Sequence, residues 1–228
     1  MEKLDRDRDA GIDIGVQLCD LCVDVLGVSG AGIMLMIDGE HSSSLGVSNP
    51  TIGVVEDLQF TLGVGPCIDA FHSGGPVLEP DLRQPAVARW PGFSVPALEA
   101  GVRAVFGFPV MSATVALGAL DVYFDRPGSL SPAQIGDAAT LTRIIARTVL
   151  EIQANTAPGA VAGQFEASIE HRAVVHQASG MVSAQLGIPV ADALARIRAY
   201  AYAEDAPIND VARRIVDRDL RLDEEVSL

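Results

Sequence analysis

A small, almost uncharged segment divides this chain into two parts with different periodicities. Residues 154–163, ANTAPGAVAG, carry no charged side chain and include one proline and two glycines. Before this segment, helical and extended patterns alternate, and after it only helical patterns occur. A chain of 228 residues has room for one or two domains of about 150 residues. We therefore expect one domain over residues 11–152, a linker over 153–163 and a second domain over 164–222.

The first part predicts several strands enclosed by helices. Residues 11–27 form a helical pattern, and residues 31–38 are a continuous apolar run suited to a buried strand. The segment 54–77 predicts a strand, a Gly-Val-Gly-Pro turn and a short helix. Two more strands are expected near 104–111 and 118–124, and a long helix should begin at Pro132 with Ser131 as its N-cap. This order predicts an α+β domain around an antiparallel sheet with flanking helices. We expect the face of the first helix that packs on it to contain Ile14, Leu18, Leu21, Cys22, Val25 and Leu26.

The second part predicts three short helices, over 165–186, 189–204 and 208–220. The second of these places Val190, Leu194, Ile197 and Ala201 on one face. Three short helices bury little apolar surface, so this module should need another surface, such as a second copy or the first domain, to be stable.

The charge distribution limits the classes of partner. The net charge of −14 disfavours general binding to nucleic acid, because phosphates repel an acidic protein. The second part is the least acidic, with seven arginines against eight carboxylates over residues 164–222. At helical spacing, Arg214, Arg218 and Arg221 would share one face, with Arg213 beside them. This face is either a phosphate-binding surface or a solvated surface paired with Asp210 and Asp217.

The Cys19–Cys22 pair and Cys67 could each serve either packing or chemistry. The Cys19–Cys22 pair has CxxC spacing, but it lies within an amphipathic helix and has no second pair, which favours packing over metal or redox chemistry. Cys67 follows the glycine turn and has His72 five residues on, so it is either a core residue or a nucleophile. We expect no metal and no cofactor. Residues 1–11, MEKLDRDRDAG, are charged and have no apolar core typical of a signal peptide, and no run of about 18 apolar residues occurs. We therefore expect a cytoplasmic protein without a membrane span.

The second part resembles an ANTAR domain, the three-helix RNA-binding module of bacterial transcription antitermination regulators. The resemblance rests on HRAVVHQASGMVSAQLGI, DALARIRAYA and PINDVARRIV. It implies binding to RNA stem-loops in nascent transcripts, commonly by paired modules in a homodimer. By this resemblance and by charge, the expected RNA-binding residues are Arg172, His176, Gln177, Gly180, Arg198, Arg213, Arg214 and Arg218, and Tyr200 or Tyr202 could stack on bases.

Three positions depart from the ANTAR pattern. Ser179 stands where a basic residue is usual, and Asp205 and Pro207 stand where Asn and Lys are usual. These departures support an alternative, in which the chain is a dimerisation and protein-interaction module that has lost RNA binding.

The first part resembles a GAF domain. The segments that carry the resemblance are TLGVGPCIDAFHSGGPVLEPDL, RWPGF, GVRAVFGFPV and LGALDVYF. It implies a sensory or dimerisation role, with an unidentified small molecule as a ligand, and the Asn-Lys-Phe-Asp-Glu pattern of cyclic-nucleotide-binding members is not visible. Together the two resemblances predict a signal-responsive antitermination regulator that is not an enzyme. A thiol reductase using Cys67 is a further hypothesis, but no partner cysteine stands at a convincing position.

Overall fold

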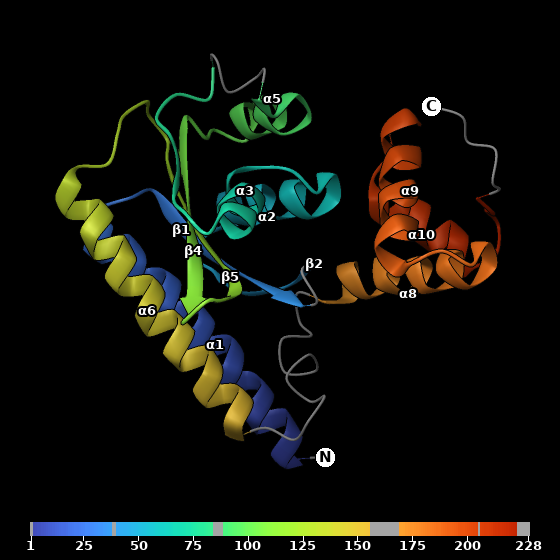
Figure 1. Ribbon diagram of the computed structural model, residues 1–228, viewed down its shortest axis with the longest axis horizontal. Coiled ribbons are helices and arrows are strands. Elements are labelled where there is room, and N and C mark those ends of the chain that lie inside the picture. Colours follow the sequence, from blue (N-terminus) through green and yellow to red (C-terminus); the bar gives the residue numbers. More distant parts are fainter. Residues whose placement is uncertain (1, 38–39, 84–88, 156–168, 205, 223–228) are drawn as a thin grey trace. The chain divides into compact units, whose positions relative to one another are not determined.

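The chain forms two compact units, Met1–Phe165 and Glu166–Leu228. The computed structural model describes residues 2–37, 40–83, 89–155, 169–204 and 206–222 (Figure 1). Most of the predicted linker over 153–163 therefore lies outside the described residues. The two units are described separately below.

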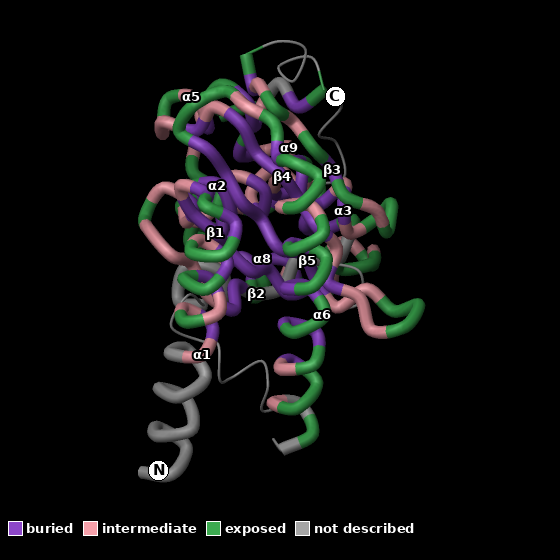
Figure 2. The backbone as a smooth tube through the Cα atoms, turned by 90° about the vertical axis from the view of Figure 1, so that its left-hand side faces the viewer, coloured by how far each residue is buried: buried purple, intermediate pink, exposed green. Residues whose placement is uncertain are grey.

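The N-terminal unit is built on a five-stranded sheet with the order β2-β1-β5-β4-β3. Each pair of neighbouring strands is antiparallel, which confirms the predicted α+β class. The strands are β1 Gly30–Ile37, β2 Glu40–Val47, β3 Val77–Glu79, β4 Ala104–Ser112 and β5 Val115–Phe124. Strands β1, β5 and β4 are buried along most of their length, as the purple segments in Figure 2 show.

Helices cover both faces of this sheet (Figure 1). Helices α1 (Glu2–Leu26) and α6 (Pro132–Asn155) contact each other and pack on one face. Helices α2 (Pro50–Leu62) and α3 (Pro66–Ser73) pack on the other, and α5 (Pro91–Glu99) contacts α2. The interior between the sheet and α2, α3 and α5 holds an apolar cluster, which includes Trp90 and Phe93.

The start of α6 confirms the helix signal in the sequence. The Ser131 amide donates to Gln134 Oε1 over 2.8 Å, and the Gln134 amide donates to Ser131 Oγ over 3.3 Å. This reciprocal pair satisfies donors that a helix start leaves open. Gln134 Nε2 also donates to the carbonyl oxygen of Leu26 over 2.6 Å. The first turn of α6 is thereby bound to the last residue of α1.

The predicted strand between residues 54 and 62 is wrong, because this segment belongs to helix α2. Asn49 caps the helix by accepting from the Ile52 amide over 3.1 Å, and Pro50 occupies the first helical position. Gly63 ends it with a left-handed φ of 67°. The buried side chains then recur at helical spacing, as Ile52, Val55, Glu56, Gln59 and Phe60.

The predicted apolar face of α1 is only partly correct. Cys22 and Leu26 are buried, and so is Cys19, but Leu21 and Val25 are 41% and 46% exposed. The helix is oriented by a close backbone approach to β2. A Cβ atom on Gly15 would lie 1.8 Å from the carbonyl oxygen of Leu45, and one on Gly46 would lie 2.4 Å from the Gly15 carbonyl carbon. This contact directs the Cys19 side of the helix, rather than the Leu21 side, towards the sheet.

The described part of the C-terminal unit contains three helices, as predicted. They are α8 (Ile169–Leu186), α9 (Val190–Ala203) and α10 (Ile208–Val216), and each contacts the other two. Leu194, Ile197 and Ala201 of α9 are buried as expected, but Val190 is 51% exposed. Val190 is the first residue of α9.

Candidate functional site

Three of the expected RNA-binding residues lie on the exposed side of α8. His176, Gln177 and Gly180 are all exposed, whereas the neighbouring Val175 is fully buried. Arg172 belongs to the same helix, but its side chain is not among those that the structure describes. The spacing of these positions places polar and small side chains on one strip of the helix.

Gly180 lies inside α8, and the fold gives no reason for a glycine there. A Cβ atom at this position would meet no described atom within 4 Å. Glycine inside a helix is about 1 kcal/mol less favourable than alanine. The position therefore combines a stability cost with an open surface on which another molecule can approach the helix backbone closely.

Ser179 does not occupy a surface position. Its side chain is fully buried, and its hydroxyl donates to the Val175 carbonyl oxygen one turn earlier, over 2.8 Å. A basic side chain at this position would enter the core of the unit in the present packing. Serine here consequently gives no evidence that a phosphate contact has been lost. Of the other two departures, Pro207 is exposed at the start of α10, and Asp205 lies outside the described residues.

The remaining arginines lie on other elements of the same unit. Arg198 on α9 is half-buried, whereas Arg213 and Arg214 on α10 are exposed. Arg213 pairs with Asp210 over 3.0 Å, which confirms part of the expected surface pairing. Within the described part of the chain, Arg214 has no acidic partner. An exposed arginine without a carboxylate is the better candidate for a phosphate contact.

The prediction that Arg214, Arg218 and Arg221 share one helical face is wrong, because α10 ends at Val216. Arg218 adopts a left-handed φ of 65°. The amides of Asp219 and Leu220 both return to the Arg214 carbonyl oxygen, over 2.8 and 2.9 Å. Leu222 is then buried, and its carbonyl oxygen accepts from Gln185 Nε2 of α8 over 3.1 Å. Arg218 is exposed in the turn after the helix.

One exposed aromatic residue adds to this unit. Tyr202 near the end of α9 is 75% exposed, whereas Tyr200 is half-buried. An exposed ring can stack on an unpaired base. Of the two tyrosines considered from the sequence, only Tyr202 presents its ring to solvent.

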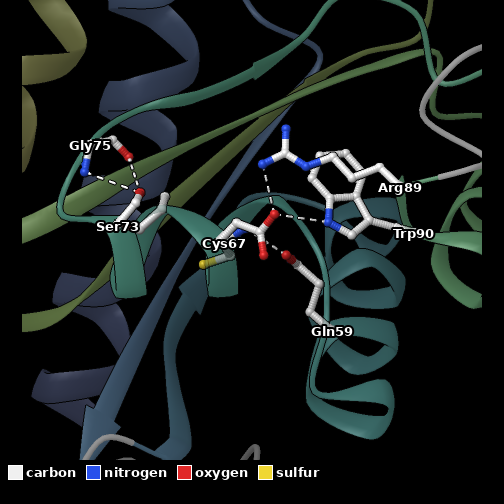
Figure 3. Close-up of polar contacts among 8 residues, drawn as sticks. Gln59, Cys67, Ser73, Gly75, Arg89 and Trp90 are labelled. Atoms are coloured by element: carbon white, nitrogen blue, oxygen red, sulfur yellow. Dashed lines mark hydrogen bonds and ion pairs between the residues drawn. The ribbon is translucent and has the colours of Figure 1, made fainter.

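The N-terminal unit contains a buried polar network that the sequence patterns did not predict. Asp121 of β5 and Gln59 of α2 are fully buried. Gln59 Nε2 donates to Asp121 Oδ2 over 2.7 Å, and Gln59 Oε1 accepts from the Cys67 amide at the start of α3, also over 2.7 Å. Figure 3 shows Gln59 reaching towards Cys67. A single charged residue within the apolar run LGALDVYF was the available signal.

Glycines on both neighbouring strands make room beside Asp121. The sheet register places Gly32 of β1 and Gly107 of β4 opposite it. A Cβ atom on Gly32 would lie 2.5 Å from Glu56 Oε1, and one on Gly107 would lie 2.5 Å from the Pro66 carbonyl oxygen. The carboxyl group of Glu56 and the start of α3 can therefore lie directly against the sheet.

A second polar cluster closes the outer side of α3. Asp69 accepts from Arg89 over 2.8 Å and from Trp90 Nε1 over 3.1 Å. The Arg89 guanidinium lies over the Trp90 ring, 4.5 Å from its centroid (Figure 3). Trp90 itself is buried in the apolar cluster, so its role here is packing.

The three cysteines are buried and form no disulfide. Burial raises the pKa of Cys22 to about 12 and the pKa values of Cys19 and Cys67 well above their usual range. The carboxyl groups of Asp121 and Glu56 raise the Cys67 value further. Such thiols are poor nucleophiles at neutral pH, and packing is the role that their surroundings support.

Comparison with protein families identifies both units. The model of the GAF domain matches residues 13–150, and the model of the ANTAR domain matches residues 163–216. The chain belongs to the GAF domain family. It carries an ANTAR domain after the GAF domain, so the resemblance found in the sequence is confirmed. No curated protein matches the chain.

Solved structures support the GAF fold. The GAF domain region of a Geobacter sulfurreducens protein, described as a membrane protein, is 16% identical and gives a TM-score of 0.52. That match covers 66% of this chain and 99% of the other. A domain of a Sinorhizobium meliloti protein, described as a two-component sensor histidine kinase, is 19% identical, with a TM-score of 0.50 and coverage of 62% and 92%. At these identities the likeness concerns the fold alone.

Further features of the GAF–ANTAR chain limit the candidate sites. In the described part of the chain, no helix is both long and apolar enough to cross a membrane. No group of three or more His, Cys, Asp or Glu side chains among the described residues is arranged to hold a metal ion. GAF and ANTAR domains are typically regulatory rather than catalytic.

Proposed function

We propose that this protein is a signal-responsive transcription antitermination regulator whose ANTAR unit binds RNA stem-loops in nascent transcripts. The observation that carries the proposal is the ANTAR match over residues 163–216. The exposed strip of His176, Gln177 and Gly180 supports it, because this strip offers polar groups and an accessible helix backbone in that domain.

The chemistry of the exposed side chains suits an RNA loop. Arg213, Arg214 and Arg218 supply cations for phosphates, and each phosphate contact adds to a salt-dependent affinity. His176 and Gln177 can donate to or accept from base edges, and Tyr202 can stack on a base. Arg172 and Arg198 remain in the proposed site on the family resemblance.

A homodimer would bring two ANTAR units to paired hairpins. Leu21 and Val25 on α1 and Ile144 on α6 are 41%, 46% and 44% exposed, although these helices belong to a well-packed unit. Exposed apolar side chains at helical spacing favour burial against a second copy. Two linked modules then bind one RNA more tightly than either alone. Replacing Leu21 and Val25 by glutamate should convert a dimer to a monomer in sedimentation equilibrium, and an unchanged dimer would place the interface elsewhere.

The GAF unit is proposed to act as the sensor or the dimerisation unit, with an unidentified small molecule as a candidate ligand. The whole protein is proposed to act in the cytoplasm and to catalyse no reaction. The buried, high-pKa thiol of Cys67 supports a non-enzymatic role. A protein-interaction module without RNA binding is the alternative, and the burial of Ser179 removes one of the arguments for it.

The test is binding of the full-length protein to a labelled RNA with two hairpins, across a salt series. Wild type is compared with Arg214→Ala, Arg218→Ala and Arg143→Ala, the last being an exposed arginine on α6 of the GAF unit. The proposal expects salt-sensitive binding whose log–log salt slope falls by about 1 for each ANTAR variant but not for Arg143→Ala. Equal slopes for all three variants would reject this surface. No binding by wild type at low salt would favour the protein-interaction alternative.

A further inference from the structure

The buried network around Asp121 belongs to the GAF unit, whereas the proposed RNA-binding residues belong to the ANTAR unit, and its composition is unusual for a core. We call Asp121, Gln59, Glu56 and Cys67 the Asp121 cluster. All four side chains are at least 99% buried, between the sheet and helices α2 and α3. The buried polar and charged side chains of the described residues include no lysine, arginine or histidine. The cluster therefore holds two carboxyl groups in an apolar interior, and none of the described basic side chains is buried with them.

The groups that face Asp121 come from each element packed against it. Helix α2 contributes Gln59 and Glu56, and α3 contributes the Cys67 thiol and amide. The flanking strands contribute Gly32 and Gly107, which carry no side chain, and Met34 of β1 lies 3.8 Å from the Cys67 sulfur. None of these groups is basic. Asp121 Oδ1 has no hydrogen-bond partner among the described residues.

The two protonation states of Asp121 make different demands on this site. A neutral carboxyl group tolerates an apolar interior with few hydrogen bonds, whereas a carboxylate needs several donors or a cation. Burial raises the pKa of Asp121 to about 7, and hydrogen bonds from Cys67 and Gln59 oppose this only in part. Once Asp121 loses its proton, the charged Oδ1 atom requires a hydrogen-bond donor, which water can supply. Water can reach it only if α2 or α3 moves away from the sheet.

We propose that the Asp121 cluster is a proton-sensitive latch, which holds α2 and α3 against the sheet when Asp121 is protonated and loosens them when it is ionised. Gln59 gives the latch its mechanical connection, because it joins Asp121 on the sheet to the first turn of α3. The latch belongs to the GAF unit alone, so it does not depend on RNA binding by the ANTAR unit.

The sign of the pH effect follows from the two pKa values. The carboxyl group has a usual pKa of 3.8 and a value of about 7 in the closed state. The closed state therefore binds the proton more tightly than an opened, hydrated state does. The opening equilibrium should increase by up to about tenfold per pH unit between about 4 and about 7, and should level off above that range.

The accessibility of Cys67 reports the opening directly. The full-length protein is exposed to a dipyridyl disulfide at whole pH values from about 5 to about 8, and labelling of each cysteine peptide is followed by mass spectrometry. Asp121→Asn preserves the shape of the side chain and removes the titration. Asp57→Asn is the matched control, since it neutralises an exposed acid on the same helix, α2.

The ratio of Cys67 labelling rates, wild type to Asp121→Asn, should rise steeply with pH and level off near 7. The Asp57→Asn protein should follow wild type. Cys19 and Cys22 of α1 serve as references within the same molecule, and their labelling should rise less steeply than that of Cys67. A pH-independent ratio at Cys67 would overturn the latch. Identical pH profiles for all three cysteines would overturn it too, because they indicate global unfolding, and this comparison needs no variant.

Discussion

Gly180→Ala should separate the stability of the ANTAR unit from its binding of RNA. The position is exposed, and a Cβ atom there meets no described atom within 4 Å, so the added methyl group causes no clash and buries little surface. The expected effect on stability is therefore the intrinsic helix preference, which favours alanine over glycine by about 1 kcal/mol. The free energy of unfolding of the ANTAR unit should rise by this amount, which corresponds to an increase of about 5 °C in its melting temperature. RNA affinity should fall by about tenfold, about 1.4 kcal/mol, if RNA approaches the helix backbone at this point.

The assay uses amide exchange of α8 in the full-length protein together with RNA binding at one salt concentration. The exchange of protected α8 amides should slow by about fivefold. Gly136→Ala is the matched control, because Gly136 is an exposed helical glycine of α6 that also has open space around its Cβ position. It should stabilise the GAF unit and leave RNA affinity unchanged. If α8 amides exchange more slowly in Gly180→Ala but RNA affinity stays at the wild-type value, RNA does not approach the helix backbone closely at this position. If α8 amides exchange faster than in wild type, the surface around Gly180 is not open.

Two further substitutions test the packing of each unit. Ser179→Lys should lower the free energy of unfolding of the ANTAR unit by at least about 3 kcal/mol in chemical denaturation, because it buries an ammonium group. Ser179→Ala should change this free energy by at most about 1 kcal/mol. A lysine variant as stable as wild type would contradict the buried position of Ser179. Gln134→Ala should cost the GAF unit about 1–2 kcal/mol through the loss of its bonds to Ser131 and Leu26. Gln134→Glu keeps the bond to Ser131 and loses the one to Leu26, so its thermal stability should fall between wild type and Gln134→Ala, and equal stability of all three proteins would show that the cap contributes nothing.

The parts of the fold that the sequence predicted well are those fixed by local signals. The start of α6 was predictable because Ser131 and Pro132 act within one helical turn, and the structure adds the reciprocal bonds of Gln134. Helix α2 was misassigned because its β-branched residues, such as Val54 and Val55, dominate the pattern, while the decisive cap, Asn49, lies outside the apolar run. Its ending at Gly63 depends on a backbone angle that the pattern alone does not specify.

The candidate sites depend on contacts between distant residues and were less predictable. The family resemblance placed His176, Gln177 and Gly180 on one helix, where the structure leaves them exposed. The end of α10 was missed because no glycine marks it, and Arg218 itself takes the left-handed conformation. Asp121 was missed because its burial depends on α2 and α3, which lie about 60 residues earlier in the chain than β5. The periodicity of a segment does not indicate which residues about 60 positions away will cover it.

The backbone contact between Gly15 and Gly46 fixes one point of α1 against β2, so the helix can tilt about this point. With backbone touching backbone, the helix cannot slide over β2, so a change in the twist of the sheet must tilt it. The pivot lies near the middle of α1, with about 13 residues, or about 20 Å, on its N-terminal side. A tilt of about 5° would displace the first turn of the helix by about 2 Å. A small adjustment of the sheet near this contact would thereby produce a larger displacement at the far end of α1.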